Sequence, residues 1–133
     1  MCRDGQAPIS IYEEAWQEAF RHKWIESEKH RHDRGHLALV DWDERYFKTF
    51  IRRCRLQHLS GQRCFREFRC EDFGAVAEPA GDVDCQVIHL FCSGKENLDI
   101  YCLAHGEGWP LERVYELLLS LDINACRLKP LVR

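Results

Sequence analysis

The stretch SIYEEAWQEAFRHKW, residues 10–24, decides the fold class. It begins with Ser10 followed three residues later by Glu13, the spacing of a capping box at the start of a helix. Side chains of an aromatic stripe then recur at helical spacing: Tyr12, Trp16, Ala19, Phe20 and Trp24. The pattern predicts a helix over about residues 11–33 that stops near Gly35.

A second helical pattern begins near His36 and should end near Ser60 and Gly61. Its apolar side chains cover a wide arc, so we expect this helix to pack on two sides. They form two adjacent rows: Leu39, Trp42, Tyr46 and Phe50, and Val40, Phe47, Ile51, Cys54 and His58. Residues 62–73, with phenylalanines among arginines, predict a short helix or a single helical turn.

The C-terminal part admits two interpretations. Residues 85–103 could form a β-hairpin with its turn at Ser93–Asn97. A helical interpretation has Asp82 and Asn97 as N-caps, Gly94 as a helix stop and Pro110 at a first helical position. The helical version explains the Gly, Pro and Asn positions together, and it leads to an amphipathic helix from Pro110 to about Leu121.

We therefore expect an all-α protein, a single compact domain of about five or six helices over residues 1–133. The alternative is an α+β fold with the hairpin at 85–103. A helical part over about 10–73 is followed by a loop at 74–82 and a second helical part over about 83–128. Because no apolar run approaches the roughly 18 residues of a membrane-spanning helix, and no signal peptide is evident, we expect a cytoplasmic protein with no membrane partner.

Charge is distributed unevenly along the chain. The formal net charge is −3, but residues 45–69 carry eight basic side chains against the single acidic Glu67. Both flanking segments are acidic. Arginine dominates the basic block, and arginine pairs well with carboxylates and phosphates. We name this set the arginine block; its members are Arg45, Lys48, Arg52, Arg53, Arg55, Arg63, Arg66 and Arg69.

The arginine block leads to three interpretations. The leading functional one is a small non-enzymatic binding or regulatory protein that engages an acidic protein surface, with Trp109 as a further anchor residue. The second is binding of single-stranded nucleic acid or RNA, with Phe65 and Phe68 stacking on bases. The third is structural: the block could pair with the acidic C-terminal segment of its own chain.

The runner-up function, ahead of nucleic-acid binding, is a metal-binding or redox protein that uses histidines and cysteines, and a cluster of histidines and acids suggests it. Its candidate ligands are Glu26, His30, His32 and His36. We expect a solvated surface there instead, and no cofactor.

The eight cysteines form no C-x-x-C pair, so we expect reduced thiols, with Cys54 and Cys102 acting as small buried hydrophobes. No serine lies in a nucleophile elbow and no glycine-rich phosphate loop is present, so no enzyme is indicated.

Overall fold

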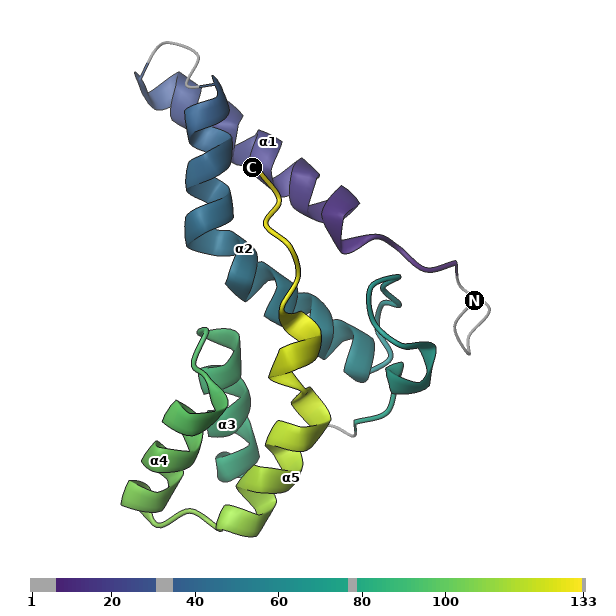
Figure 1. Ribbon diagram of the computed structural model, residues 1–133, viewed down its shortest axis with the longest axis vertical. Coiled ribbons are helices and arrows are strands. Elements are labelled where there is room, and N and C mark those ends of the chain that lie inside the picture. The colour runs from purple at the N-terminus through teal and green to yellow at the C-terminus, as the bar shows by residue number, and fades with distance from the viewer. Residues whose placement is uncertain (1–6, 31–34, 77–78, 133) are drawn as a thin grey trace.

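The computed structural model describes residues 7–30, 35–76 and 79–132, and within them the chain is helical (Figure 1). Two long helices meet at one end of the molecule, and three shorter ones gather beside the far half of the second. The α-helices are α1 (Ile11–His30), α2 (Gly35–Leu59), α3 (Asp82–Cys92), α4 (Asn97–Glu107) and α5 (Leu111–Leu121). Two 3-10 turns are η1 (Cys70–Asp72) and η2 (Ile123–Cys126).

This architecture confirms the all-α prediction. In the described ranges there is no strand, and the one β-bridge joins Ile9 to Phe65. Residues 85–103, where a hairpin was the alternative, form α3, a turn and α4. Gly94 lies in that turn with a φ of 97°, a conformation that glycine adopts without strain.

The start of α1 is capped differently from the capping-box prediction. The Ser10 hydroxyl accepts a hydrogen bond from the Tyr12 amide at 3.2 Å. The carboxylate that completes the cap comes from Glu67, which accepts from the Ile11 amide and from the Ser10 hydroxyl, each at 2.8 Å. Glu67, the single acid among residues 45–69, thus fastens α1 to the segment that follows α2.

Helix α2 is packed on two sides, as its wide apolar arc predicts. Its buried residues include Trp42, Phe47, Ile51 and Cys54. α1 lies along its first half, and α3, α5 and η2 pack against it further on. The chain then returns toward α1, where the Leu131 amide donates to Asp43 of α2 at 2.7 Å.

Residues 62–76 are mostly irregular, so the short helix predicted at 62–73 is reduced to η1. The buried His58 organises this segment. Its Nδ1 accepts from the Phe65 amide at 3.0 Å and its Nε2 donates to the Arg69 carbonyl at 2.8 Å. Both ring nitrogens of a neutral imidazole are thereby satisfied.

A charged pair joins the first and the last of the three C-terminal helices. Asp84 of α3 is buried and accepts two hydrogen bonds from Arg113 of α5, at 2.9 and 2.7 Å. This bidentate geometry is the strongest form of an arginine–carboxylate pair. In the part of the chain that is described, no helix is long and apolar enough to cross a membrane.

Candidate functional site

The structure divides the arginine block instead of presenting it as one surface. Arg52 and Arg55 are each only 2% exposed, whereas Arg53, between them, is exposed. Helical geometry explains the division, because positions 52 and 55 lie on the same face one turn apart while position 53 points elsewhere. Arg52 and Arg55 are not available to a partner, which corrects that part of the predicted surface.

Arg52 joins α2 to the turn between α3 and α4. Its guanidinium donates to the carbonyls of Phe91 and Lys95 and to the Glu96 carboxylate, the last at 2.6 Å. It also lies 5.2 Å from the centre of the Phe91 ring. Burial alone would raise the pKa of Glu96, but hydrogen bonds from Arg127 and Arg52 outweigh burial and hold that pKa below its ordinary value.

Arg55 makes a similar connection one turn further along α2. Its Nε donates to the Leu121 carbonyl at 2.9 Å, and its Nη1 donates to Asp72 at 3.1 Å. The guanidinium lies 5.0 Å from the centre of the Phe68 ring. Glu96 and Asp72 both belong to the acidic C-terminal segment, so internal pairing accounts for these two arginines.

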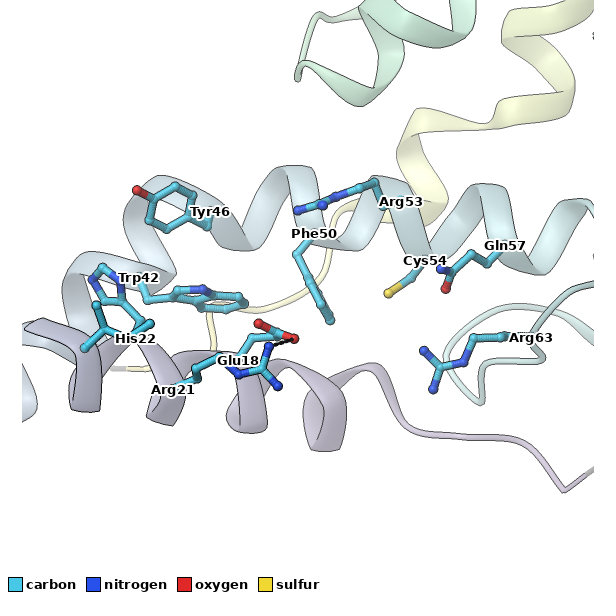
Figure 2. Close-up of a pocket in the computed structure, with 11 residues that line it drawn as sticks. Glu18, Arg21, His22, Trp42, Tyr46, Phe50, Arg53, Cys54, Gln57 and Arg63 are labelled. Atoms are coloured by element: carbon cyan, nitrogen blue, oxygen red, sulfur yellow. Dashed lines mark hydrogen bonds and ion pairs between the residues drawn. The ribbon is translucent and has the colours of Figure 1, made fainter.

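The exposed Arg53 borders a groove between α1 and α2 of about 460 Å³ (Figure 2). Aromatic side chains of α2 line it: Phe50 points across the space toward α1, and the ring of Trp42 lies between the two helices. We name it the basic groove; its lining residues are Glu18, Arg21, His22, Ile25, Trp42, Tyr46, Phe50, Arg53, Cys54, Gln57 and Arg63.

Three arginines reach the basic groove from three different elements: Arg21 from α1, Arg53 from α2 and Arg63 from the segment after α2. Arg63 is paired with Glu14, and Arg21 lies 3.5 Å from Glu18 in an exposed pair. Among the described residues Arg53 has no ion-pair partner. The lining carries three arginines and the carboxylate of Glu18. Because Glu14 and Glu18 pair with Arg63 and Arg21, Arg53 is the cation in excess at the groove.

Two further groups of the groove, His22 and Cys54, are not open to chemistry. His22 is 2.9 Å from Asp41 through Nε2. Burial raises the pKa of the Cys54 thiol to about 12, against a smaller lowering by Arg53. A thiol with that pKa is protonated at neutral pH and is a poor nucleophile, so the basic groove is better suited to binding than to covalent chemistry.

The remaining members of the arginine block are spread over other surfaces. Arg45 pairs loosely with Asp41 at 3.5 Å, and Lys48 lies 3.9 Å from Glu96. Arg69 is exposed and lies 3.2 Å from its neighbour Glu71. Arg66 is exposed and has no ion pair in the ranges described. Of the predicted partner residues, Arg53 and Arg63 meet at the basic groove, while Lys48 and the buried Arg52 meet beside the C-terminal segment near Glu96.

Other predicted site residues are placed as follows. Trp109 is half-buried in the turn between α4 and α5, where it packs against the core. Phe65 and Phe68 are buried at 0% and 6% exposure, so neither can stack on a nucleic-acid base. Their positions remove the aromatic support for the nucleic-acid interpretation.

The metal candidates do not assemble in the described part of the chain. Glu26 and His30 are 3.5 Å apart, one helical turn along α1, and His36 is exposed on α2. His32 lies outside the described residues. No group of three or more histidine, cysteine or acidic side chains there could hold a metal ion.

Six cysteines are free thiols: Cys54, Cys70, Cys85, Cys92, Cys102 and Cys126. For these six the expectation of reduced cysteines is confirmed. Cys54 is buried, as predicted, but Cys102 is exposed on α4, because the helix turns that position away from the core.

Sequence reasoning missed the part that α1 plays in the basic groove. Arg21 and Glu18 lie outside the arginine block, and only the packing of α1 against α2 brings them beside Arg53. The usable signal was the first apolar row predicted for α2, since its members Trp42, Tyr46 and Phe50 line the groove. Comparison with known proteins gives no further guidance: no family model, curated protein or solved structure matches the chain.

Proposed function

We propose that this protein is a non-enzymatic binding protein whose basic groove takes an acidic segment of a partner protein. The observation that carries the proposal is Arg53, an exposed arginine without an ion pair in the described structure, beside an aromatic-lined groove. An arginine in this setting offers paired hydrogen-bond donors to a carboxylate. Arg21 and Arg63 are further donors at the groove, each already paired with a carboxylate of α1.

The aromatic lining favours a segment that carries an apolar or aromatic side chain among its acids. Tyr46 is 38% exposed, and Phe50 is half-buried at the groove. Such rings offer contact area at a low cost in conformational entropy, which is why aromatic and arginine residues concentrate at binding hot spots. Acidic residues would pair with the arginines while the apolar side chain packs between α1 and α2.

An acidic protein segment also fits better than nucleic acid. Phe65 and Phe68, the candidates for base stacking, are buried. Helix α1 also carries acids close to the groove, among them Glu14 and Glu18. A phosphate backbone has regularly spaced negative charge and would meet these carboxylates. A short protein segment can place its acids only beside the arginines.

The test is a titration of a labelled peptide of glutamates around one tryptophan against the wild type, Arg53→Glu and Arg69→Glu. Arg69 is the matched control, an exposed arginine outside the groove. Arg53→Glu should weaken binding about tenfold, because it replaces an attraction by a repulsion, and Arg69→Glu should leave it within about twofold. Equal losses in both variants, or tighter Arg53-dependent binding of a single-stranded oligonucleotide, would overturn the proposal.

A further inference from the structure

A second groove lies on the C-terminal helices, between α4 and α5, with a volume of about 440 Å³. Unlike the basic groove it is almost entirely apolar. Its lining residues are Asn97, Leu98, Tyr101, Tyr115, Leu118 and Leu119. We name it the apolar groove; it is separate from the basic groove, with which it shares no residue.

The apolar groove leaves large hydrophobic side chains in water. Leu98 is 72% exposed, Leu119 61% and Tyr115 57%, while Leu118 is buried beneath them. Single exposed leucines are ordinary on a protein surface, but a cluster of large apolar side chains around one groove marks an interaction site. The groove has the form that receives an amphipathic helix.

The charge around the apolar groove specifies the partner. Glu112 and Glu116 are exposed on α5. Because side chains three residues apart are neighbours on a helix, Glu112 lies beside Tyr115 and Glu116 beside Leu119. The one basic residue of α5, Arg113, is already held by Asp84 and Glu116. Across residues 82–121 seven acidic side chains accompany only two basic ones. An acidic rim attracts a positively charged partner and repels a negatively charged one.

The apolar groove is also preformed. Arg113 fastens α5 to α3 through the buried Asp84. At the other end Glu96 and Asp99 form a capping box at the start of α4, and Glu96 is in turn held by Arg52 and Arg127. A site that is rigid before binding loses little conformational entropy when it is occupied.

We infer that the apolar groove binds a basic amphipathic helix of a partner protein, which packs its apolar face on Leu98, Tyr115 and Leu119 and places lysines or arginines beside Glu112 and Glu116. The inference is independent of the proposed function of the basic groove. Together the two sites would let one small domain join an acidic segment to a basic helix.

The experiment uses two labelled peptides of identical leucine and lysine content. One has an amphipathic helical order, and the other is scrambled so that no apolar face forms. Each is titrated against the wild type, the double variant Leu98→Gln/Leu119→Gln, and the control Leu37→Gln. Leu37 is 70% exposed on α2, away from the groove. All three substituted leucines are largely solvated, so the variants should fold, which circular dichroism verifies.

The wild type should bind the amphipathic peptide about tenfold or more tightly than the scrambled one, because only an ordered apolar face fits the groove. Leu98→Gln/Leu119→Gln should abolish this preference and Leu37→Gln should keep it. Equal binding of both peptides by the wild type would overturn the inference, as would a preference that survives in the double variant. It would also be overturned if sedimentation showed self-association that the same double variant abolishes, since the occupant would then be a second copy of this chain.

Discussion

Arg52 of α2 and Glu96 at the start of α4 form an ion pair of 2.6 Å in which the arginine is buried and the glutamate is partly exposed. The same guanidinium satisfies the carbonyls of Phe91 and Lys95. These bonds join the two halves of the molecule, because α2 belongs to the N-terminal helical pair and α4 to the C-terminal group. An arginine of the basic block thus has a structural role.

Replacing Arg52 by methionine keeps the apolar stem and removes the guanidinium. We expect Arg52→Met to lower the free energy of unfolding by about 3 kcal/mol, because buried carbonyls lose their donor and Glu96 loses its closest partner. Urea denaturation measures this change. Lys48→Met is the control, since Lys48 lies 3.9 Å from the same carboxylate but is well exposed; it should cost less than about 1 kcal/mol. Similar costs in both variants would contradict the assigned role of Arg52.

Charge reversal should change the free energy of unfolding far more at a buried arginine of α2 than at an exposed one. Arg55→Glu places a carboxylate beside Asp72 and the Leu121 carbonyl in a buried position, so it should lower the free energy of unfolding by more than about 3 kcal/mol. Arg53→Glu changes an exposed side chain and should stay within about 0.5 kcal/mol of the wild type. Thermal melts followed by circular dichroism compare the two. A stable Arg55→Glu variant would show that burial of this arginine is not required for folding.

Stability should depend on pH through His58. Burial, aided by Arg55, lowers the pKa of His58 below its ordinary value of 6.5, against the opposing effects of the Arg69 carbonyl and Asp72. In the unfolded chain the His58 imidazole therefore binds a proton as the pH falls below about 6.5, whereas in the folded chain it does so only at a lower pH. The stability that the neutral His58 provides should be fully present above that pH. Below it, the free energy of unfolding should decrease by at most about 1.4 kcal/mol per pH unit.

The measurement is urea denaturation between pH 8 and pH 5 for the wild type and two variants. His58→Gln should flatten the pH dependence, and His89→Gln, which removes an exposed imidazole of α3, should leave it unchanged. A wild-type slope that persists without His58 would assign the effect to another group.

The thiols should differ in reactivity according to burial. Burial raises the pKa of Cys54 to about 12 and that of Cys126 to about 11, whereas Cys85 and Cys102 are exposed free thiols. Because the thiolate is the reactive form, iodoacetamide at neutral pH should modify Cys85 and Cys102 long before Cys54 and Cys126. Peptide mass spectrometry reads out the order. Early labelling of Cys54 would indicate a reactive thiol in the basic groove and would favour the redox interpretation.

Helical periodicity and the positions of glycine and proline predicted the helices well. The aromatic stripe after Ser10 located α1, and Gly94 with Pro110 separated the C-terminal helices, because glycine and proline restrict the backbone locally. The cap of α1 was not predictable in the same way. Glu67 is remote in sequence from Ser10, and only the folded chain brings their side chains together.

The site was harder to predict for a related reason. Arginine is normally solvated, so the sequence gives no direct indication that Arg52 and Arg55 enter the core while Arg53 does not. Their burial depends on carbonyls at the ends of α3 and α5 that tertiary packing supplies. The acidic excess of the C-terminal segment indicated internal pairing in general but could not assign the pairs.

The most direct test of the account is to locate the bound acidic peptide on the protein by NMR. In a titration with the glutamate peptide that carries one tryptophan, the side-chain Nε–H resonance of Arg53 should shift in a saturable way together with the indole N–H of Trp42, while that of Arg69 stays in place. Saturable shifts at Arg69 or Arg66 with none at Arg53 would contradict binding in the groove between α1 and α2.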